Sequence, residues 1–443
     1  MPRNLCDMPF RVLWWSRAVS FTGDGIGRTA LVLYAAAHGA TAVSLVLLAI
    51  ALPRFLGPVA GALADRLDQR RLMAVCEIGQ AAVFALLAVF LPPLPVLVAF
   101  VLVGGCFATA FVPAGRSAVP ALVPERDLGR ANALLGMAFN IQLAVGPTVG
   151  GLAVELGGAR IAFAVNAVTF VVSALTLTRL PALRSPGVHT GLWAETVAGL
   201  RFVATTPGPR ALVVSLFLVV SFAAIDNVAL VFLVSDLGGS PADFGLTQAA
   251  YGVGMLLASA LLGFVLGKRS PAALLIGGIG LVSTGAVATA LLPTLLAVAV
   301  AQAVGGMGNG TENIATDTLV QRITPRHLLG RAFGAIATAA QLGSAVAYVA
   351  AGPLVGLVGP RGAFLVGGIG TGVALVVAVP ALRAHARVDR RSRGRSQPGQ
   401  AGEYPGRVGR SQRSADVDPV GHLARVEDLT DQDRPGLRTD FDG

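Results

Sequence analysis

Residues 61–71 read GALADRLDQRR and join two apolar runs, at 42–63 and 72–91. Each run is long enough to cross a bilayer, because a membrane-spanning helix needs about 20 largely apolar residues. The joining stretch begins with a glycine, continues with an Asp-Arg pair and ends on two arginines. So short and so basic a connection predicts a sharp turn between two spanning helices, on the side of the membrane where positive charge gathers.

The composition extends this interpretation to the whole chain. Of its 443 residues, 54% are hydrophobic and 13% are charged, and the mean hydropathy is +0.70. A soluble domain usually has about 25% charged residues. Apolar runs of sufficient length give twelve predicted spans, near 12–37, 42–63, 72–91, 95–119, 131–154, 160–180, 211–235, 244–267, 272–292, 294–321, 332–357 and 362–382. We therefore expect an all-α membrane protein with twelve transmembrane helices.

The arginines and lysines predict the orientation. Alternate connections are basic, and they contain Arg66, Arg70, Arg71, Arg126, Arg130, Arg184, Arg201, Arg210, Lys268, Arg269, Arg322, Arg326 and Arg331. The other connections are nearly uncharged, with Arg160 and Arg361 as the main exceptions. Since basic loops are cytoplasmic, we expect a multi-pass protein of the cell membrane with both termini in the cytoplasm. The same placement accounts for the net charge of +10 without a nucleic-acid partner.

Several classes of site are not indicated. Cys6, Cys76 and Cys106 are widely spaced and the five histidines are scattered, so we expect no disulfide framework, metal or cofactor. The first apolar run contains charged residues and no small-residue cleavage site, which argues against a cleavable signal peptide. The string GFVLGKR at 263–269 is one residue shorter than a phosphate-binding loop and ends in arginine, which argues against ATP-driven transport.

The two halves of the chain repeat one another. The stretch PERDLGRA at 124–131 matches PRHLLGRA at 325–332 with an offset of 201 residues, and 61–66 aligns with 263–268 at an offset of 202. Both matches lie in predicted cytoplasmic connections. The duplication predicts two pseudo-symmetric six-helix bundles, an architecture of transporters that bind their substrate between the halves.

The longest internal connection divides the chain. We expect a first six-helix bundle at 1–181, a central cytoplasmic loop at 182–210, a second six-helix bundle at 211–383 and a disordered cytoplasmic tail at 384–443. The tail begins with several arginines and continues with proline, glycine, serine and aspartate, a composition typical of disorder. Within the loop, 191–203 is either an amphipathic helix at the membrane interface or a plain linker.

Charged residues within the spans are the first candidates for function. A charge at the bilayer centre costs about 2.5–3.5 kcal/mol on insertion scales, so such residues are expected to face the bundle interior. Asp24 and Arg28 are four residues apart, which places them on one helix face, where we expect them to pair. A conformational change that separates them would alter the proton affinity of Asp24, as proton-coupled transport requires. The alternative is a static ion pair that fixes the first helix.

Further candidates for proton coupling or for lining the cavity lie in other spans. Asp226, beside Asn227, follows Asp24 at an offset of 202. The remaining candidates are Glu312, Asp317 and Arg116, of which Arg116 and Asp317 are related by an offset of 201. All of these are polar groups in apolar surroundings, which marks them as candidates rather than as a defined site.

Two more charged residues allow two interpretations each. Glu77 lies near the cytoplasmic end of its span, where it either acts in transport or pairs with loop arginines. Arg54 follows Pro53 and either lines the cavity or neighbours Asp65.

The joining stretch at 61–71 resembles the signature of the major facilitator superfamily, Gly-x-x-x-Asp-Arg-x-Gly-Arg-Arg, between the second and third helices. The matching residues are Gly61, Asp65, Arg66, Arg70 and Arg71. Asp68 stands where the family prefers glycine, which would loosen the turn. The resemblance implies that Asp65 latches the cytoplasmic side in the outward-facing state. From the residues themselves, we expect Gly61 to permit close helix approach and Asp65 to cap a neighbouring helix N-terminus.

A second motif lies in the fifth predicted span. Its proline removes a helix hydrogen bond and its glycines let helices pack closely. The motif is similar to one typical of exporters in the same superfamily, although Gln142 replaces an upstream glycine, and a looser copy, GPLVG, lies at 352–356. The motif residues are Gly146, Pro147, Gly150 and Gly151.

Further resemblance covers residues 10–383. The strings FVPAGRSAVPALVP at 111–124, RANAL at 130–134 and QRITP at 321–325 are similar to the branch of macrolide-efflux and siderophore-export proteins. This resemblance implies a proton-coupled exporter, an antiporter of small amphipathic molecules such as drugs, antibiotics or siderophore-like metabolites. We expect a monomer that works by alternating access. An uptake symporter and a membrane-embedded enzyme are the alternatives, and the enzyme lacks a cluster of catalytic residues.

Overall fold

The structure is a computed structural model that describes residues 8–183, 205–265, 270–324 and 328–395. Within these ranges the regular elements are helices, and no strand is present. The helices up to Ser392 pack as one compact unit. The predicted all-α fold is therefore confirmed.

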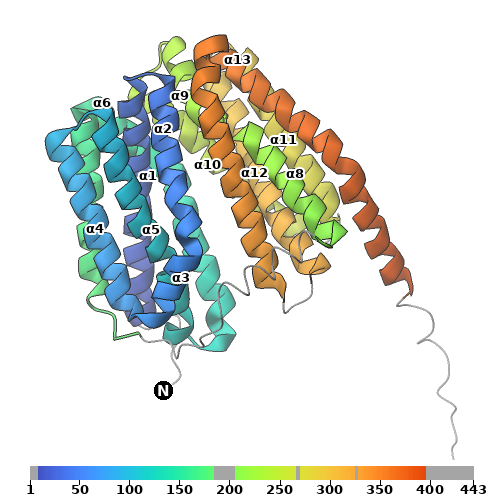
Figure 1. Ribbon diagram of the computed structural model, residues 1–443, viewed down its shortest axis with the longest axis horizontal. Coiled ribbons are helices and arrows are strands. Elements are labelled where there is room, and N and C mark those ends of the chain that lie inside the picture. The colour runs from blue at the N-terminus through green and yellow to red at the C-terminus, as the bar shows by residue number, and fades with distance from the viewer. Residues whose placement is uncertain (1–7, 184–204, 266–269, 325–327, 396–443) are drawn as a thin grey trace, which may run out of the picture. The chain divides into compact units, whose positions relative to one another are not determined.

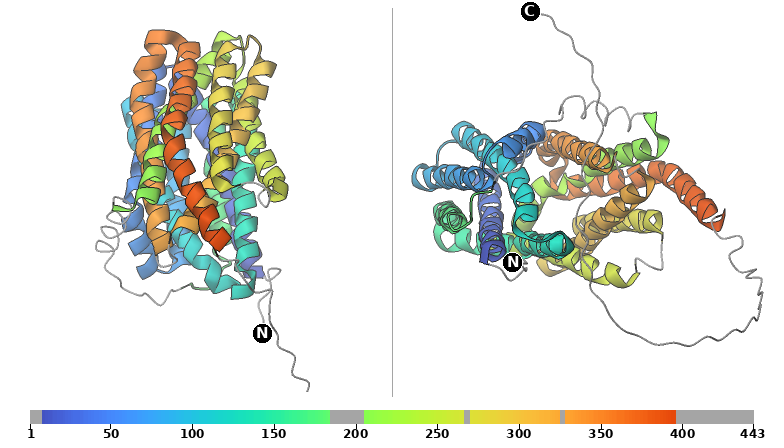
Figure 2. Two further views of the ribbon diagram at one scale, coloured as in Figure 1. Left: turned by 90° about the vertical axis from the view of Figure 1, so that its right-hand side faces the viewer. Right: turned by 90° about the horizontal axis from the view of Figure 1, so that it is seen from below.

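The two halves of the chain form two groups of helices, seen side by side in Figure 1 and from two further directions in Figure 2. The first half consists of α1 (Met8–Ala36), α2 (Ala40–Ala51), η1 (Leu52–Leu56), α3 (Gly57–Arg66), α4 (Gln69–Phe90), α5 (Leu94–Leu122), η2 (Glu125–Asp127) and α6 (Leu128–Leu177). The second half consists of α8 (Pro207–Ala223), α9 (Asp226–Asp236), α10 (Pro241–Val265), α11 (Pro271–Leu291), α12 (Leu295–Ile323) and α13 (Leu329–Arg395).

Two of these helices each reverse direction at a glycine. Within α6, Gly158 has φ +69°, and within α13, Gly359 has φ +71°. A residue with a side chain is strained in this region, so glycine is the residue that permits the reversal. The two glycines are 201 residues apart, the offset seen in the repeated loops. The turn is therefore part of the duplication.

The lengths of the helices bear on the predicted number of crossings. Among the residues that the structure describes, eight helical stretches are long and apolar enough to span a membrane, and the stretches at Glu125–Leu177 and Leu329–Pro380 contain 53 and 52 residues. At 1.5 Å per residue each of these two measures about 80 Å, twice what one crossing needs. The helices α1 and α12 have 29 residues each and are interrupted by charged residues. The fold is thus consistent with twelve transmembrane helices.

The second predicted span is broken by two prolines. The short η1 turn starts at the residue before Pro53, and α3 starts at the residue before Pro58. Proline lacks a backbone N–H, so it fits the first turn of a new helix and not the middle of an old one. The break exposes one turn of the chain, which contains Arg54, near the middle of the span.

The buried core differs between the two ends of the helices. We call the end with the basic connections the inner end and the opposite end the outer end. One core cluster contains residues of both halves, including Leu47, Val228 and Phe244. Two further clusters near the inner end each belong to one half, the first around Met73 and the second around Leu275. The halves therefore share a core toward the outer end.

Parts of the predicted organisation fall outside the described residues. They include most of the central loop with 191–203, and the predicted tail from 396 onward. The helix α13 continues to Arg395, beyond the residue 383 at which the second bundle was expected to end. Its last turns are rich in arginine, which is a good helix former.

Candidate functional site

The middle of α1 has one tightly packed side and one charged side. A Cβ added to Gly25 would lie 2.8 Å from the Cα of Gly146 in α6. Two residues further on, Gly27 contacts the buried side chain of Asn166, also in α6. Because α6 occupies these directions with its backbone and side chains, glycine is required there. Arg28, one residue further on, is left to reach the second half.

Asp24 and Arg28 do not pair as expected. Among the described residues, the ion pair closer than 4.0 Å is that of Arg126 with Asp127, at 3.7 Å. Arg28 instead crosses to the second half, where its Nη2 donates a long hydrogen bond of 3.5 Å to Oδ1 of Asn227. The predicted Asp24–Arg28 ion pair is wrong for this conformation, because the long arginine side chain reaches a partner on the opposite bundle.

The cationic neighbour of Asp24 is Arg54. The two groups interact electrostatically, although they belong to α1 and to the η1 turn. Arg54 also interacts with Arg28 and with Tyr348 of α13. Of the two interpretations of Arg54, the cavity-lining one is confirmed.

A small cavity lies between the halves beside these charges. Its volume is about 20 Å³, room for about one water molecule. The side chains of Arg28 and Arg54 therefore border a space that is too small for an organic cargo. The lining residues are Arg28, Leu47, Ile50, Ala51, Arg54, Gln341, Ser344 and Tyr348.

Asp226 and Asn227 lie where the seventh predicted span is interrupted. The helix α8 ends at Ala223, and α9 begins at Asp226. Nδ2 of Asn227 donates to Oδ1 of Asp226 at 2.9 Å and to the carbonyl oxygen of Ala224 at 3.3 Å. Arg28 interacts electrostatically with Asp226. An interrupted helix brings polar groups to the middle of a transporter, and here it brings an acid to an arginine of the other half.

A tyrosine connects the acidic residues of the second half. Glu312 is 4% exposed in α12. Tyr251 of α10 interacts electrostatically with both Asp226 and Glu312. Sequence analysis missed Tyr251, because an aromatic residue in an apolar span carries no signal of its own.

A second charged group lies toward the inner end of the first half. Glu77 is fully buried, and its Oε2 accepts a hydrogen bond of 3.3 Å from Ser20. Arg17 is 6% exposed and lies 4.6 Å from the ring centre of Phe111, a cation–π contact. Glu77 interacts with Arg17 and with Asp24. Its charged partner is thus a buried arginine rather than the loop arginines, and it extends the central charges toward the inner end.

The remaining candidates lie apart. Asp317 and Arg116 are exposed, in the inner parts of α12 and α5, and neither lines the central cavity. Arg116 interacts electrostatically with Arg17. In the part of the chain that the structure describes, no group of three or more His, Cys, Asp and Glu side chains is arranged to hold a metal ion.

The Gly-Pro motif brings α6 against two helices. A Cβ added to Gly146 would lie 2.7 Å from the Cα of Gly25 in α1. A Cβ added to Gly151 would lie 3.1 Å from the Cα of Gly245 in α10, across the two halves. The close packing expected of this motif is therefore present, and its far end forms part of the boundary between the bundles.

The signature loop has a different helix cap from the expected one. Asp68, at the position where glycine is preferred, accepts hydrogen bonds from the backbone N–H of Arg71 at 3.0 Å and of Leu183 at 3.1 Å. It is the N-cap of α4. Asp65 is exposed and, among the described residues, makes no hydrogen bond or ion pair, and the space beside Gly61 is open. The close approach expected at Gly61 is thus not made in this conformation.

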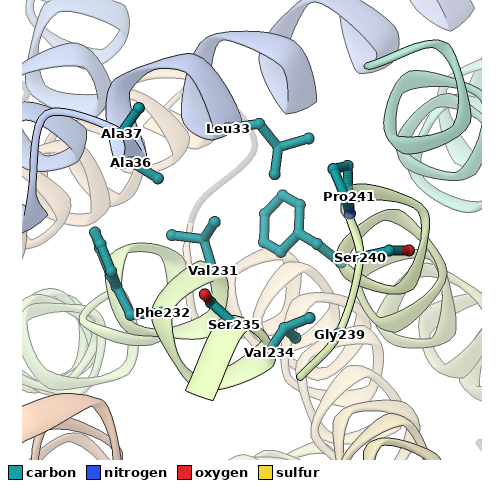
Figure 3. A pocket seen from close by; sticks show the side chains of 11 residues that line it. Leu33, Ala36, Ala37, Val231, Phe232, Val234, Ser235, Gly239, Ser240 and Pro241 are labelled. Atoms are coloured by element: carbon teal, nitrogen blue, oxygen red, sulfur yellow. The ribbon is translucent and has the colours of Figure 1, made fainter. Parts of the chain in front are cut away.

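An apolar pocket of about 260 Å³ lies at the outer end. Figure 3 shows Leu33 of α1 opposite Val231, Val234 and Pro241 of the second half. Two serines, Ser235 and Ser240, are among its lining residues. The pocket is mainly apolar and lies at the end where the two halves share their core.

The chain matches a known protein family over most of its length. Residues 4–398 match the family described as transmembrane secretion effector. The multidrug efflux pump Tap of Mycolicibacterium fortuitum is 28% identical over 380 residues, which cover 81% of this chain and 91% of the relative. The enterobactin exporter EntS of Salmonella typhimurium is 29% identical over 329 residues, which cover 70% and 76%.

Solved structures share the fold. The nucleoside transporter NupG superposes with a TM-score of 0.74, covering 85% of this chain and 100% of that chain at 13% identity. At this identity the likeness concerns the fold and says nothing about the cargo.

Proposed function

Because the chain belongs to the transmembrane secretion effector family of the major facilitator superfamily, we propose that it exports small amphipathic organic molecules in exchange for protons. Drugs, antibiotics and siderophore-like metabolites are the expected substrates. The chain is a membrane-embedded transporter rather than an enzyme, since its family and its relatives are transporters. The proposal places it in the cell membrane as a monomer with both termini in the cytoplasm.

One contact carries the proposal of proton coupling. Arg28 belongs to the first half but contacts Asn227 and interacts with Asp226 in the second. Asp24 lies four residues before Arg28 in the same helix, near enough to become its partner when the halves separate. Opening the outer end would move Arg28 from one aspartate toward the other. The proton affinity of each acid then depends on which end of the transporter is open.

The two aspartates have matched surroundings. Asp24 interacts with Arg54 and Asp226 interacts with Arg28, so each acid has one arginine, and both arginines come from the first half. A proton that neutralises either acid releases its arginine from an electrostatic partner. In the proposed cycle, protons enter from the outer side to these acids and leave on the inner side by way of Glu77, with the exposed Asp317 as a further candidate acid toward that end. In the second half, Tyr251 interacts with both Asp226 and Glu312, so these two residues belong to the same set of interacting polar groups.

The direction of transport is supported by two observations. The relatives named above are an efflux pump and an exporter, and the chain has the Gly-Pro motif of exporters. The shared core at the outer end supports a conformation that is closed to the outside and loads cargo from the cytoplasm. The signature loop, with Asp65, Arg66, Arg70 and Arg71, would close the inner end in the other conformation.

Transport into inverted membrane vesicles tests this function. Vesicles that contain the chain and are acidified inside should accumulate a fluorescent amphipathic dye, and a protonophore should stop the accumulation. The Asp24→Asn variant should reach the membrane at the normal level and lose at least about tenfold of the proton-driven uptake, because one titrating group is removed. Asp236→Asn, which changes an exposed aspartate at the outer end, is the matched control and should transport normally.

The outcome also decides between export and import. Accumulation that needs an alkaline interior, or that proceeds only in right-side-out vesicles, would support the uptake symporter. Full proton-driven export by Asp24→Asn would assign this residue to structure. A requirement for sodium in place of protons would show a different coupling ion.

A further inference from the structure

Glu155 joins the two halves at the outer end. It lies one turn after Gly151 in α6, and its Oε2 accepts hydrogen bonds from the hydroxyl of Ser240 at 2.7 Å and from the backbone N–H of Ala242 at 3.0 Å. Both partners are at the N-terminus of α10 in the second half. The first N–H groups of a helix lack partners within the helix and carry partial positive charge. A carboxylate is therefore the side chain that binds this end best.

The contact sits beside the closest approach of the halves. A Cβ added to Gly151 would lie 3.2 Å from the Cα of Ala242 and 3.1 Å from that of Gly245. The chain cannot open at the outer end without separating α6 from α10 here. Both hydrogen bonds of Glu155 are lost in that movement, and water replaces them.

The duplicated half provides an internal comparison. The offset of 201 residues relates Gly151 to Gly352 and Ala242 to Thr41, and Gly352 indeed packs on Thr41, with its added Cβ 2.8 Å from the Thr41 Cα. The same offset relates Glu155 to Gly356, which is exposed with open space around it. The corresponding helix, α2, has no side-chain cap at its N-terminus.

The two copies of the crossing show that the close helix packing does not depend on a carboxylate. A close helix crossing forms in both copies, yet only the first copy has an acid that binds the facing helix end. Glu155 is therefore not needed for the crossing itself. It adds an interaction that exists in the conformation closed at the outer end and is absent when that end opens.

We propose that Glu155, Ser240 and Ala242 form an outer clasp, which holds the transporter closed at the outer end and sets how often it opens there. The clasp rests on the proposed function in one respect. It assumes that the transporter alternates between a conformation open at the outer end and one open at the inner end. Glu155 acts through the helices and does not touch cargo. It is a positioning residue for the transport cycle.

Distances between spin labels at the outer end test the clasp directly. His38 and Asp236 are exposed at the outer ends of the two halves, and labels at both positions, in a chain with Cys6, Cys76 and Cys106 replaced, report the separation in lipid vesicles. In Glu155→Ala the ratio of long to short distances should rise about three- to tenfold, in line with the loss of a helix cap. Ser240→Ala should produce a smaller rise in the same direction.

Two controls separate the clasp from general effects. Arg160→Ala removes an exposed charge just after the turn of α6 at Gly158 and should leave the distances unchanged. In the double variant Glu155→Ala/Ser240→Ala, the rise should be no larger than in Glu155→Ala, because the two residues share one contact. The midpoint of thermal unfolding should be the same in Glu155→Ala and Arg160→Ala.

The spin-label distances test the clasp and the vesicle assay tests the proposed function, and either proposal can be wrong while the other holds. Unchanged distances in folded Glu155→Ala and Ser240→Ala would overturn the clasp, even if the protein exports dye as proposed. A shift toward long distances in a chain without proton-driven export would support the clasp and overturn the proposed coupling. Equal shifts in Glu155→Ala and Arg160→Ala would also overturn the clasp, by assigning the effect to a general disturbance of α6 near its turn at the outer end.

Discussion

Gly151 and Gly245 meet backbone to backbone across the two halves of the chain. A Cβ added to either would lie 3.1–3.2 Å from the Cα of the other. The same relationship recurs 201 residues away, where Gly352 lies against Ser44, with its added Cβ 3.2 Å from the Ser44 Cβ. The outer boundary of the bundles is thus built twice from one duplicated crossing, and the first copy coincides with the exporter motif.

A side chain at the first crossing should push the halves apart. We expect Gly151→Ala to lower the free energy of unfolding by about 1–3 kcal/mol, as overpacking does, and to reduce dye export. Thermal unfolding in detergent and vesicle transport measure the two effects. Gly136→Ala in the same helix is the control, because the space beside Gly136 is open. Equal effects of the two substitutions would contradict a tight contact at Gly151.

A double-mutant cycle can identify which arginine is energetically coupled to Asp24. Asp24 interacts with Arg54, so the effects of Asp24→Asn and Arg54→Gln on unfolding should be non-additive. We expect a coupling of roughly 0.5–1 kcal/mol, toward the low end of coupled pairs because Arg54 is exposed. The coupling energy between Asp24→Asn and Arg28→Gln should be smaller than that between Asp24→Asn and Arg54→Gln. A larger coupling energy with Arg28→Gln would instead support the Asp24–Arg28 pair expected from the spacing of four residues.

The buried pair of the first half should behave as a unit. Arg17→Met removes the charged neighbour of the buried carboxyl group of Glu77, and should destabilise the protein by about 1–3 kcal/mol. The double variant Arg17→Met/Glu77→Gln should recover most of this loss, as measured by the midpoint of thermal unfolding. Arg11→Met, at an exposed position of the same helix, should have little effect. Additive losses in the double variant would show that the two residues act separately.

Substitutions of the two aspartates of the signature loop, Asp65 and Asp68, should have different effects, one on transport and the other on stability. Asp68 caps α4 and binds the backbone of Leu183, so Asp68→Ala should lower the free energy of unfolding by about 1 kcal/mol. Asp65 has no hydrogen bond or ion pair within the described residues, and Asp65→Ala should leave stability unchanged while slowing export, as proposed for the signature loop. Loss of stability in Asp65→Ala with none in Asp68→Ala would reverse these assignments.

The sequence determined the fold through patterns that are local or repeated. Apolar length marked the spans, because lipid cannot satisfy backbone polar groups and only helices cross it here. The repeated loop at 124–131 marked the duplication, and Gly158 with Gly359 shows the same offset in the turns. The Gly-Pro motif marked a close crossing, since glycine in an apolar helix has few other uses.

Only the tertiary structure decided which charges meet. The spacing of four residues placed Asp24 and Arg28 on one helix face, but an arginine side chain can reach groups on several helices. The rotation of each helix, which apolar periodicity does not specify in a chain surrounded by lipid, turned Arg28 to Asn227 and Asp24 to Arg54. Glu155 carried no signal at all, since an acid at a helix end is ordinary until the N-terminus of α10 is brought beside it.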